Sequence, residues 1–403
     1  MGINYFVYTI LLVIVLGACS KQSPDVVTSE PEALAIHMAH SQMARSATSL
    51  KIGGSDPKAK WRYTTGLFLS SLLRLHDEVG DTASYLYAKR VIDSFIGEDG
   101  SIAKFKMSDY NIDNINSGKS LLRFYKKTGE DKYRLASDLL REQLRGQPRT
   151  SEGGFWHKKR YPWQMWLDGI YMGSPFYAAY GKMFGEPDAF DDVVNQVVLI
   201  DRYTRHHESG LRYHAWDESG EQAWADSITG CSSHFWGRGM GWYAMALVDI
   251  LDWLPDGHQG RDTVLTIFKD VMEAVRIVQD EKTGVWYQVL DLHNREGNYL
   301  EASASSMFTY AYAKGLNKSY LDQRFESVAR KAWAGVIETF IELDSEGNLH
   351  LNHCCSGAGL GGKPYRDGSF EYYMSEPVIS NDLKGVGPFI MAALEMQQLV
   401  DEM

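Results

Sequence analysis

Apolar and polar positions alternate along this chain in two recurring helical patterns. Six stretches are mostly apolar, and each follows a cluster of Gly, Ser or Asp; they are residues 67–75, 121–125, 175–180, 242–251, 307–313 and 389–399. Six others are apolar on one side only, at helical spacing; they are residues 31–44, 85–95, 131–144, 188–205, 261–278 and 321–341. Helices that are apolar all round belong in a core, whereas one-sided helices belong on a surface. The pattern predicts an all-α fold of two concentric rings of six helices, an (α/α)6 barrel.

The connections that lead from an outer helix to the next inner helix carry turns followed by polar and aromatic residues. Two examples are SEGGFWH at residues 151–157 and SGLRYH at residues 209–214. In such a barrel these connections all lie at one end. Because functional residues concentrate on loops held by a rigid scaffold, we expect the binding site at this rim.

The first 18 residues are predicted to be a lipoprotein signal peptide. The apolar run at residues 10–16 is too short to span a bilayer, and LGAC at residues 16–19 resembles a bacterial lipobox, although no Lys or Arg precedes the run. Cleavage before Cys19 would leave this cysteine to carry a lipid, and an uncleaved anchor is the alternative. Residues 19–30 are polar and predict a flexible tether, followed by one catalytic domain at residues 31–403. We expect an exported lipoprotein, periplasmic or anchored in the outer membrane, that meets the membrane only through its lipid.

The composition narrows the classes of partner. A net charge of −11 argues against nucleic acid binding, which requires a basic surface. Cys231 stands alone and Cys354 is adjacent to Cys355, so neither a disulfide framework nor the spacing of metal ligands is present. There is also no HExxH pattern. We therefore expect no metal, no cofactor and no nucleic acid partner, while the sequence makes no prediction of the oligomeric state.

Asp168 is the strongest candidate for a catalytic acid. An isolated Asp at the start of a helix is most often an N-cap, and this interpretation applies also to Asp113 and Asp382. Asp168 differs because it lies within YPWQMWLDGIYM at residues 161–172, where bulky rings would exclude water and favour the neutral carboxyl group. A neutral carboxyl group can hold a proton and deliver it. Asp113, before the preceding inner helix, is the expected second carboxylate, since a carboxylate pair is usual for chemistry on sugars.

Aromatic residues are candidates for sugar binding because the apolar C–H faces of sugars stack on aromatic rings. The chain has 11 Trp and 23 Tyr, many of them in the predicted rim loops. Trp166, Trp236 and Trp242 stand beside polar residues at the starts of inner helices, which favours them over the others. Packing in the core is the alternative interpretation for each of them.

Three basic residues are also candidates for substrate binding. Arg238 lies among glycines ahead of an apolar helix, where a guanidinium group requires an anion. This anion is either a structural Asp or the carboxylate of a ligand, which Arg binds through two parallel hydrogen bonds. His157 and His214 fall in rim loops and are suited to binding hydroxyl groups or water, with structural hydrogen bonds as the alternative.

Several motifs together resemble the unsaturated rhamnogalacturonyl hydrolases of glycoside hydrolase family 105. They are MWLDGIYM at 165–172, WGRGMGW at 236–242, GLGGKPYRDGS at 359–369, EYY at 371–373 and NDLKGVG at 381–387. The resemblance covers nearly everything after the tether and implies an (α/α)6 barrel without metal or cofactor. It implies that Asp168 is the catalytic aspartate and Asp113 the second acidic residue. It also implies that the pocket is lined by Tyr63, His157, Trp166, His214, Arg238 and Trp242.

The resemblance also implies an unusual reaction. In this family the terminal sugar carries a C4–C5 double bond left by a polysaccharide lyase. Asp168 would protonate the vinyl ether, water would add at C5, and the resulting hemiketal would open and release the rest of the oligosaccharide. We therefore expect release of a terminal 4,5-unsaturated galacturonyl residue from rhamnogalacturonan oligosaccharides, with Arg238 binding the uronate carboxylate.

Three alternatives stay open at this point. An unsaturated glucuronyl hydrolase acting on glycosaminoglycan or ulvan fragments keeps the fold and chemistry, and the cations at residues 158–160 would suit sulfated substrates. A glycosidase acting on saturated glycans would need two carboxylates across a cleft with room for water. A non-catalytic glycan-binding lipoprotein fits the aromatic loops, but it does not explain a shielded acid near Arg238.

Overall fold

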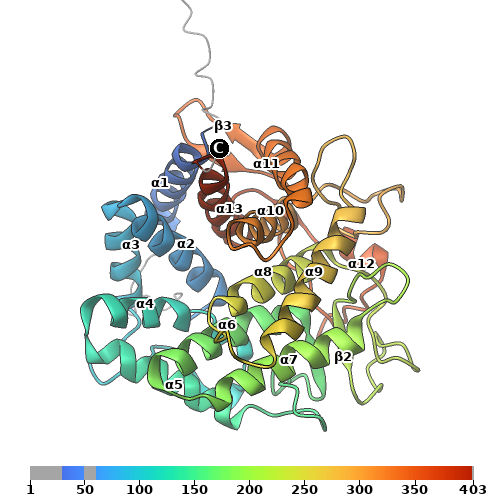
Figure 1. Cartoon of the computed structure of the whole chain (residues 1–403), viewed down its shortest axis with the longest axis horizontal. Helices are drawn as coiled ribbons and strands as arrows, with labels where there is room; N and C mark the ends of the chain where they lie inside the picture. The colour runs from blue at the N-terminus through green and yellow to red at the C-terminus, as the bar shows by residue number, and fades with distance from the viewer. Residues whose placement is uncertain (1–29, 50–59, 402–403) are drawn as a thin grey trace, which may run out of the picture.

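The computed structural model describes residues 30–49 and 60–401, and within them the helices form two concentric rings (Figure 1). The inner ring consists of α2 (Tyr63–Val79), α4 (Gly118–Thr128), α6 (Leu167–Phe184), α8 (Gly237–Leu251), α10 (Ala302–Asn317) and α13 (Leu383–Asp401). The outer ring consists of α1 (Pro31–Ser49), α3 (Thr82–Asp93), α5 (Asp131–Gly146), α7 (Asp188–Thr204), α9 (Arg261–Ile277) and α11 (Glu326–Phe340). Each inner helix packs against the next, and α13 closes the ring against α2. The predicted (α/α)6 barrel is confirmed.

The burial of the two rings follows from their sequences. In α8 and α10 almost every residue is buried, whereas α7 buries one side and exposes the other. The first outer helix, α1, packs against the last inner helix, α13, so the two ends of the described chain together complete the sixth hairpin (Figure 1). The apolar pattern therefore indicates both the number of helices and the ring to which each belongs.

Close packing of the inner helices depends on small residues at their starts. A Cβ atom on Gly66 in α2 would lie 2.6 Å from the Cα atom of Ser117, which precedes α4. Only glycine permits this approach of the two backbones without displacement. The inner helices are thereby held near the barrel axis, with their N-terminal ends close together.

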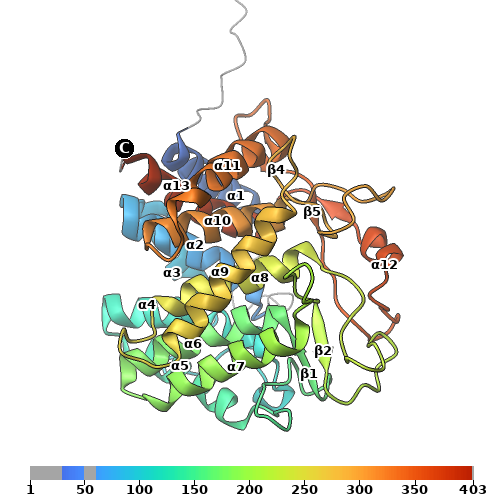
Figure 2. The same cartoon turned by 45° about the vertical axis from the view of Figure 1, so that its right-hand side comes forward.

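The short elements of the structure lie in the connections between the helices, and all except the 3-10 turn between α10 and α11 precede an inner helix. These are η1 (Met107–Asp109), η2 (Ile112–Ile115), β1 (Gln164–Trp166), β2 (Ala215–Asp217), η3 (Gln323–Phe325), β3 (Ile341–Leu343), β4 (Leu349–Leu351), β5 (Cys354–Cys355), α12 (Phe370–Ser375) and β6 (Val378–Ile379). In the described chain, the strands form three antiparallel pairs, β1–β2, β3–β4 and β5–β6. Figure 2 shows β1, β2, β5 and α12 on the same side of the barrel, where the predicted rim is located.

The predictions for the N-terminus lie outside the described residues. The signal peptide at residues 1–18, the lipidation of Cys19 and nearly all of the tether at residues 19–30 therefore stay predictions, as does the starting point of the catalytic domain. Among the helices within residues 30–49 and 60–401, none combines the length and the apolar character needed to cross a membrane.

Candidate active site

The β1–β2 pair brings Asp168 next to His214. Trp166 pairs with Ala215 across the two strands, and the Leu167 amide donates a hydrogen bond to the His214 carbonyl oxygen at 3.1 Å. Asp168 follows as the second residue of α6, and its Oδ2 lies 3.4 Å from Nε2 of His214. Within the described part of the chain, both of these atoms are buried without a hydrogen-bond partner. The Asp168 side chain is only 15% exposed, so its carboxyl group is shielded from bulk water.

Asp113 lies in η2 beside two basic residues. The His157 amide donates to the Gln164 carbonyl oxygen and its own carbonyl accepts from the Ile112 amide, which fixes His157 next to η2. His157 Nε2 lies 3.3 Å from Asp113 Oδ1, and Lys158 Nζ lies 2.5 Å from Oδ2. Burial acts to raise the pKa of Asp113, but Lys158 and His157 hold it below its ordinary value. Asp113 is therefore an ionised carboxylate at neutral pH.

His157 is a neutral imidazole enclosed by aromatic rings. Burial lowers the pKa of His157 to about 4 in spite of the nearby charge of Asp113. Its ring is stacked on Trp166, with centroids 4.7 Å apart and planes within 3° of parallel, and Trp166 is stacked in turn on Tyr161 at 5.2 Å. A Cβ atom on Gly169 would lie 3.0 Å from His157 Nδ1, so a glycine at this position lets His157 lie close to α6.

Tyr63, the first residue of α2, lies near both carboxylates and near Arg238. Burial raises the pKa of the Tyr63 hydroxyl, the charges of Asp113 and Asp168 raise it further, and Arg238 lowers it. All three charged groups therefore lie within electrostatic range of this one hydroxyl group. The Tyr63 ring packs edge-on against Trp242, with ring centroids 6.2 Å apart.

Arg238 is buried and keeps part of its guanidinium group free. Its Nη1 donates to the carbonyl oxygen of Cys355 at 2.6 Å and to Oγ of Ser303 at 3.2 Å. Among the described residues, no carboxylate lies within 4.0 Å of the guanidinium group, and Nε and Nη2 have no partner. Arg238 therefore makes no direct ion pair with a structural Asp, although the charges of Glu301 and Asp382 lie near enough to raise its pKa. Two donors stay available for the carboxylate of a ligand.

The rings of Trp236 and Trp242 are each only 1% exposed. Trp236 is stacked on Tyr373 at 6.2 Å and lies 5.0 Å from the Arg238 guanidinium group. Trp242 is stacked on Tyr171 at 4.9 Å. Packing accounts for nearly all of their surface, so sugar binding by these two rings stays a prediction.

Two contacts of the site were not predicted from the sequence. The hydroxyl group of Tyr373, in α12, lies 2.9 Å from Nδ1 of His214. Lys158, which the sequence suggested only as a contact for sulfate groups, forms an ion pair with Asp113. Tyr373 stands within a recognised motif, yet 159 positions separate it from His214. Only the fold brings α12 to this rim.

Comparison with known proteins shows the family to which the chain belongs. The family model described as Glycosyl Hydrolase Family 88 matches residues 35–400. The solved structure of a family 105 glycoside hydrolase from C. acetobutylicum ATCC 824 is 45% identical, with a TM-score of 0.85, over 89% of this chain and 98% of that chain. Protein Atu3128 of Agrobacterium fabrum is 40% identical over 233 residues, which are 56% of this chain and 97% of that protein.

A further relative has a named activity. The unsaturated rhamnogalacturonyl hydrolase YesR of Bacillus subtilis is 28% identical over 202 residues, which are 49% of this chain and 56% of that protein. Together with the matches above, this similarity supports membership of the unsaturated uronyl hydrolases. The chain matches the Glycosyl Hydrolase Family 88 model and belongs to glycoside hydrolase family 105, among the unsaturated uronyl hydrolases.

Proposed function

We propose that this enzyme releases a terminal 4,5-unsaturated galacturonyl residue from rhamnogalacturonan oligosaccharides produced by a lyase. The observation that carries the proposal is the Asp168 carboxyl group, which is shielded from solvent with one oxygen facing His214 and otherwise unpaired. Such a group is suited to deliver a proton to a carbon atom of a bound substrate. The activity of the Bacillus subtilis relative favours the same substrate class.

The proposed reaction begins at the double bond. Asp168 transfers its proton to C4, and the positive charge that develops is shared between C5 and the ring oxygen. Water adds at C5 and returns a proton to Asp168, which regenerates the acid. The hemiketal at C5 then opens to a ketone, and the hemiacetal freed at C1 releases the remaining oligosaccharide as an alcohol.

The neighbouring groups have complementary roles in this scheme. Nε and Nη2 of Arg238 are free to bind the carboxylate on C5, where two parallel hydrogen bonds would orient the alkene. Asp113 cannot serve as the acid because it is ionised, so we assign it to sugar hydroxyl groups and to stabilisation of the developing cation. His214 positions Asp168, and the neutral His157 is available for a hydroxyl group.

The second sugar decides which substrate is used. Galacturonate and glucuronate differ only in configuration at C4, and the lyase makes C4 trigonal, so both yield the same terminal residue. Discrimination therefore depends on the rim, where Trp163 is 41% exposed and provides an apolar surface for a neutral deoxy sugar such as rhamnose.

A glucuronyl hydrolase acting on glycosaminoglycan or ulvan fragments is the second candidate. Lys159 and Arg160 are exposed at this rim, and the charge of Arg160 contributes to the lowered pKa of Asp113, which indicates that it lies near the site. Two cations in this position favour a second sugar that carries sulfate or carboxylate.

A panel of disaccharides tests the proposal. The ultraviolet absorbance of the C4–C5 double bond disappears during the reaction, so initial rates can be compared directly. We expect the highest kcat/KM with the unsaturated rhamnogalacturonan disaccharide and no reaction with its saturated counterpart. Faster turnover of chondroitin or ulvan disaccharides would replace the proposed substrate with the second candidate. Cleavage of the saturated disaccharide would contradict the proposed reaction itself.

A further inference from the structure

A cavity lies along the barrel axis, at the end opposite to Asp168. Its volume is about 640 Å³, within the range of sites that bind small molecules. It is formed by α4, α6 and the C-terminal halves of α2, α8, α10 and α13. None of the proposed active-site residues lines it. Tyr171 separates the two ends, because its ring is stacked on Trp242 and also lines the cavity.

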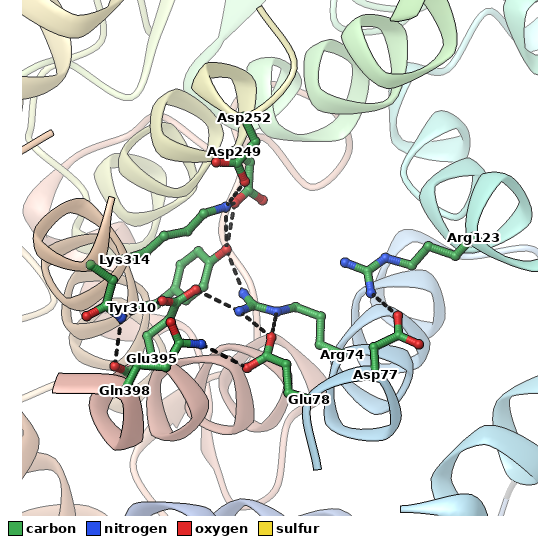
Figure 3. Close-up of polar contacts among 11 residues, drawn as sticks. Arg74, Asp77, Glu78, Arg123, Asp249, Asp252, Tyr310, Lys314, Glu395 and Gln398 are labelled. Atoms are coloured by element: carbon green, nitrogen blue, oxygen red, sulfur yellow. Dashed lines mark hydrogen bonds and ion pairs between the residues drawn. The ribbon is translucent and has the colours of Figure 1, made fainter. Parts of the chain in front are cut away.

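One wall of this cavity is neutralised by its own contacts. Lys314 Nζ lies 2.6 Å from both Asp249 and Asp252. Figure 3 shows the hydroxyl group of Tyr310 at the centre of this network, donating to Asp249 at 2.6 Å and accepting from Lys314 at 3.1 Å. The chain thus supplies the anions for this cation, and no external ligand is needed there.

The same wall also neutralises Arg74. Its guanidinium group contacts Glu78 at 2.8 Å and Glu395 at 2.6 Å, and it donates to the Tyr310 hydroxyl at 2.9 Å (Figure 3). Arg74 and Lys314 therefore each contact two carboxylates. The opposite wall has a different ratio of cations to carboxylates.

The opposite wall, formed by α4, has more cations than carboxylates. Lys119, Arg123, Lys126 and Lys127 all line the cavity from this helix. Arg123 and Lys127 share a single carboxylate, Asp77, at 3.1 and 3.2 Å. Figure 3 shows Arg123 and Asp77 apart from the network around Tyr310. This wall therefore has an excess of positive charge in a protein whose net charge is −11.

Lys119 is a partly buried cation of this wall, and none of the ion pairs among the described residues includes it. Its Nζ lies 3.5 Å from the centroid of the Tyr171 ring and 3.5 Å from the Tyr171 carbonyl oxygen. Within the described residues, no carboxylate oxygen lies within 4.0 Å of this ammonium group. Burial lowers the pKa of Lys119 to about 7; the charge of Asp249 acts against this shift, and Arg123 and Lys314 act with it. An anion bound beside this partly buried ammonium group would stabilise its charged form.

Apolar side chains line the rest of the cavity. They include Leu73, Leu122, Met183 and Trp253. We propose that this cavity binds a small organic anion, a carboxylate or phosphate on a body of about the size of a monosaccharide, with Lys119 and Arg123 as the residues that bind the charge. The apolar surface and the Trp253 ring would contact the C–H groups of this body.

Titration calorimetry of the purified full-length protein tests this proposal. The probes are galacturonate, inorganic phosphate and, as the neutral control, galactose. We expect at least one of the two anions to bind and galactose not to bind. Tighter binding of galacturonate would identify a carboxylate ligand, and tighter binding of phosphate would identify a phosphorylated one.

Substitutions of cavity residues test whether the anion binds in this cavity. Lys119→Met and Arg123→Gln are each expected to weaken anion binding roughly tenfold or more, because a hydrogen bond to a charged group is lost. Lys119→Met removes a poorly compensated charge, so the variant should fold. Arg134→Gln is the matched control, since this arginine is half exposed on α5 and does not line the cavity.

Galacturonate could also enter the active site, so Asp168→Asn is titrated in parallel. Binding that survives Asp168→Asn and is weakened by the two cavity substitutions would support the cavity site. The proposal is overturned if neither anion binds, if galactose binds as tightly, or if Lys119→Met and Arg123→Gln leave the affinity unchanged. None of these results depends on the proposed hydrolytic activity.

Discussion

Nε2 of His214 lies 3.4 Å from Oδ2 of Asp168, while Nδ1 of the same ring lies 2.9 Å from the hydroxyl group of Tyr373. With the Tyr373 hydroxyl group donating to Nδ1, Nε2 is the ring nitrogen that carries a proton, and it faces Asp168. A residue of α12 thereby orients His214, which directly precedes β2, toward the proposed acid Asp168. We therefore assign Tyr373 as a positioning residue, since it acts through His214.

Tyr373→Phe tests this relationship. We expect kcat to fall roughly tenfold with little change in KM, because one hydrogen bond that orients His214 is lost. The pH profile of kcat should shift as well, which a purely structural role would not cause. Tyr372→Phe is the matched control, because this neighbouring hydroxyl contacts Gly359 and Glu376 rather than His214. Equal losses in both variants would contradict the positioning role.

Arg238→Met tests the recognition of the uronate carboxylate. We expect kcat/KM to fall roughly a hundredfold, because the free donors Nε and Nη2 are lost from a buried position. The matched comparison is the methyl ester of the same disaccharide, which carries no charge at this position. The wild-type enzyme should prefer the free acid, and the variant should lose this preference. An unchanged preference would place the carboxylate elsewhere.

Gly169→Ala tests the close packing of His157 against α6. The added Cβ atom would lie 3.0 Å from Nδ1 of His157, so the imidazole must shift. We expect a loss of about 1–3 kcal/mol in the free energy of unfolding, together with reduced activity. Gly257→Ala is the control, since a Cβ atom there meets nothing within 4 Å. Thermal unfolding of both variants checks the prediction.

His157 makes stability depend on pH in acid. The folded protein lowers the pKa of His157 from an ordinary value of 6.5 to about 4, so protonation favours the unfolded chain. Its contribution is complete above about pH 6.5 and is lost as the pH falls toward 4, with a size on the order of 3 kcal/mol. Protonation of Asp113 at lower pH acts in the same direction, because its pKa is also lowered.

Urea unfolding between pH 4 and pH 7 measures this dependence. In His157→Gln the free energy of unfolding should vary less with pH over this window than in the wild type, since one titrating group is removed. The same slope in both proteins would show that His157 is not held neutral by burial.

The helices of this protein could be predicted from the sequence because each ring has its own apolar pattern. Asp168 could be selected because its aromatic neighbours are adjacent in sequence. The hydrogen-bond partners of Arg238 could not be predicted from the sequence. One of them is the backbone carbonyl of Cys355, and every residue has such a carbonyl, so the residue type gives no indication of the contact. The contact between Tyr373 and His214 depends on where the fold places α12.

The cavity at the opposite end was also not predicted. Asp249, Lys314 and Glu395 are single charged residues in or just beyond otherwise apolar helices, and the sequence gives no sign that they meet. They gather because the C-terminal ends of the inner helices converge around one axis.

The most direct test of the central claim is the activity of Asp168→Asn on the unsaturated rhamnogalacturonan disaccharide. Asparagine keeps the shape of the side chain but cannot donate a carboxylic proton, so the loss of ultraviolet absorbance should slow by at least about a hundredfold. Unfolding transitions matching those of the wild type would confirm that the variant is folded. Activity near that of the wild type in this folded variant would contradict the assignment of Asp168 as the acid.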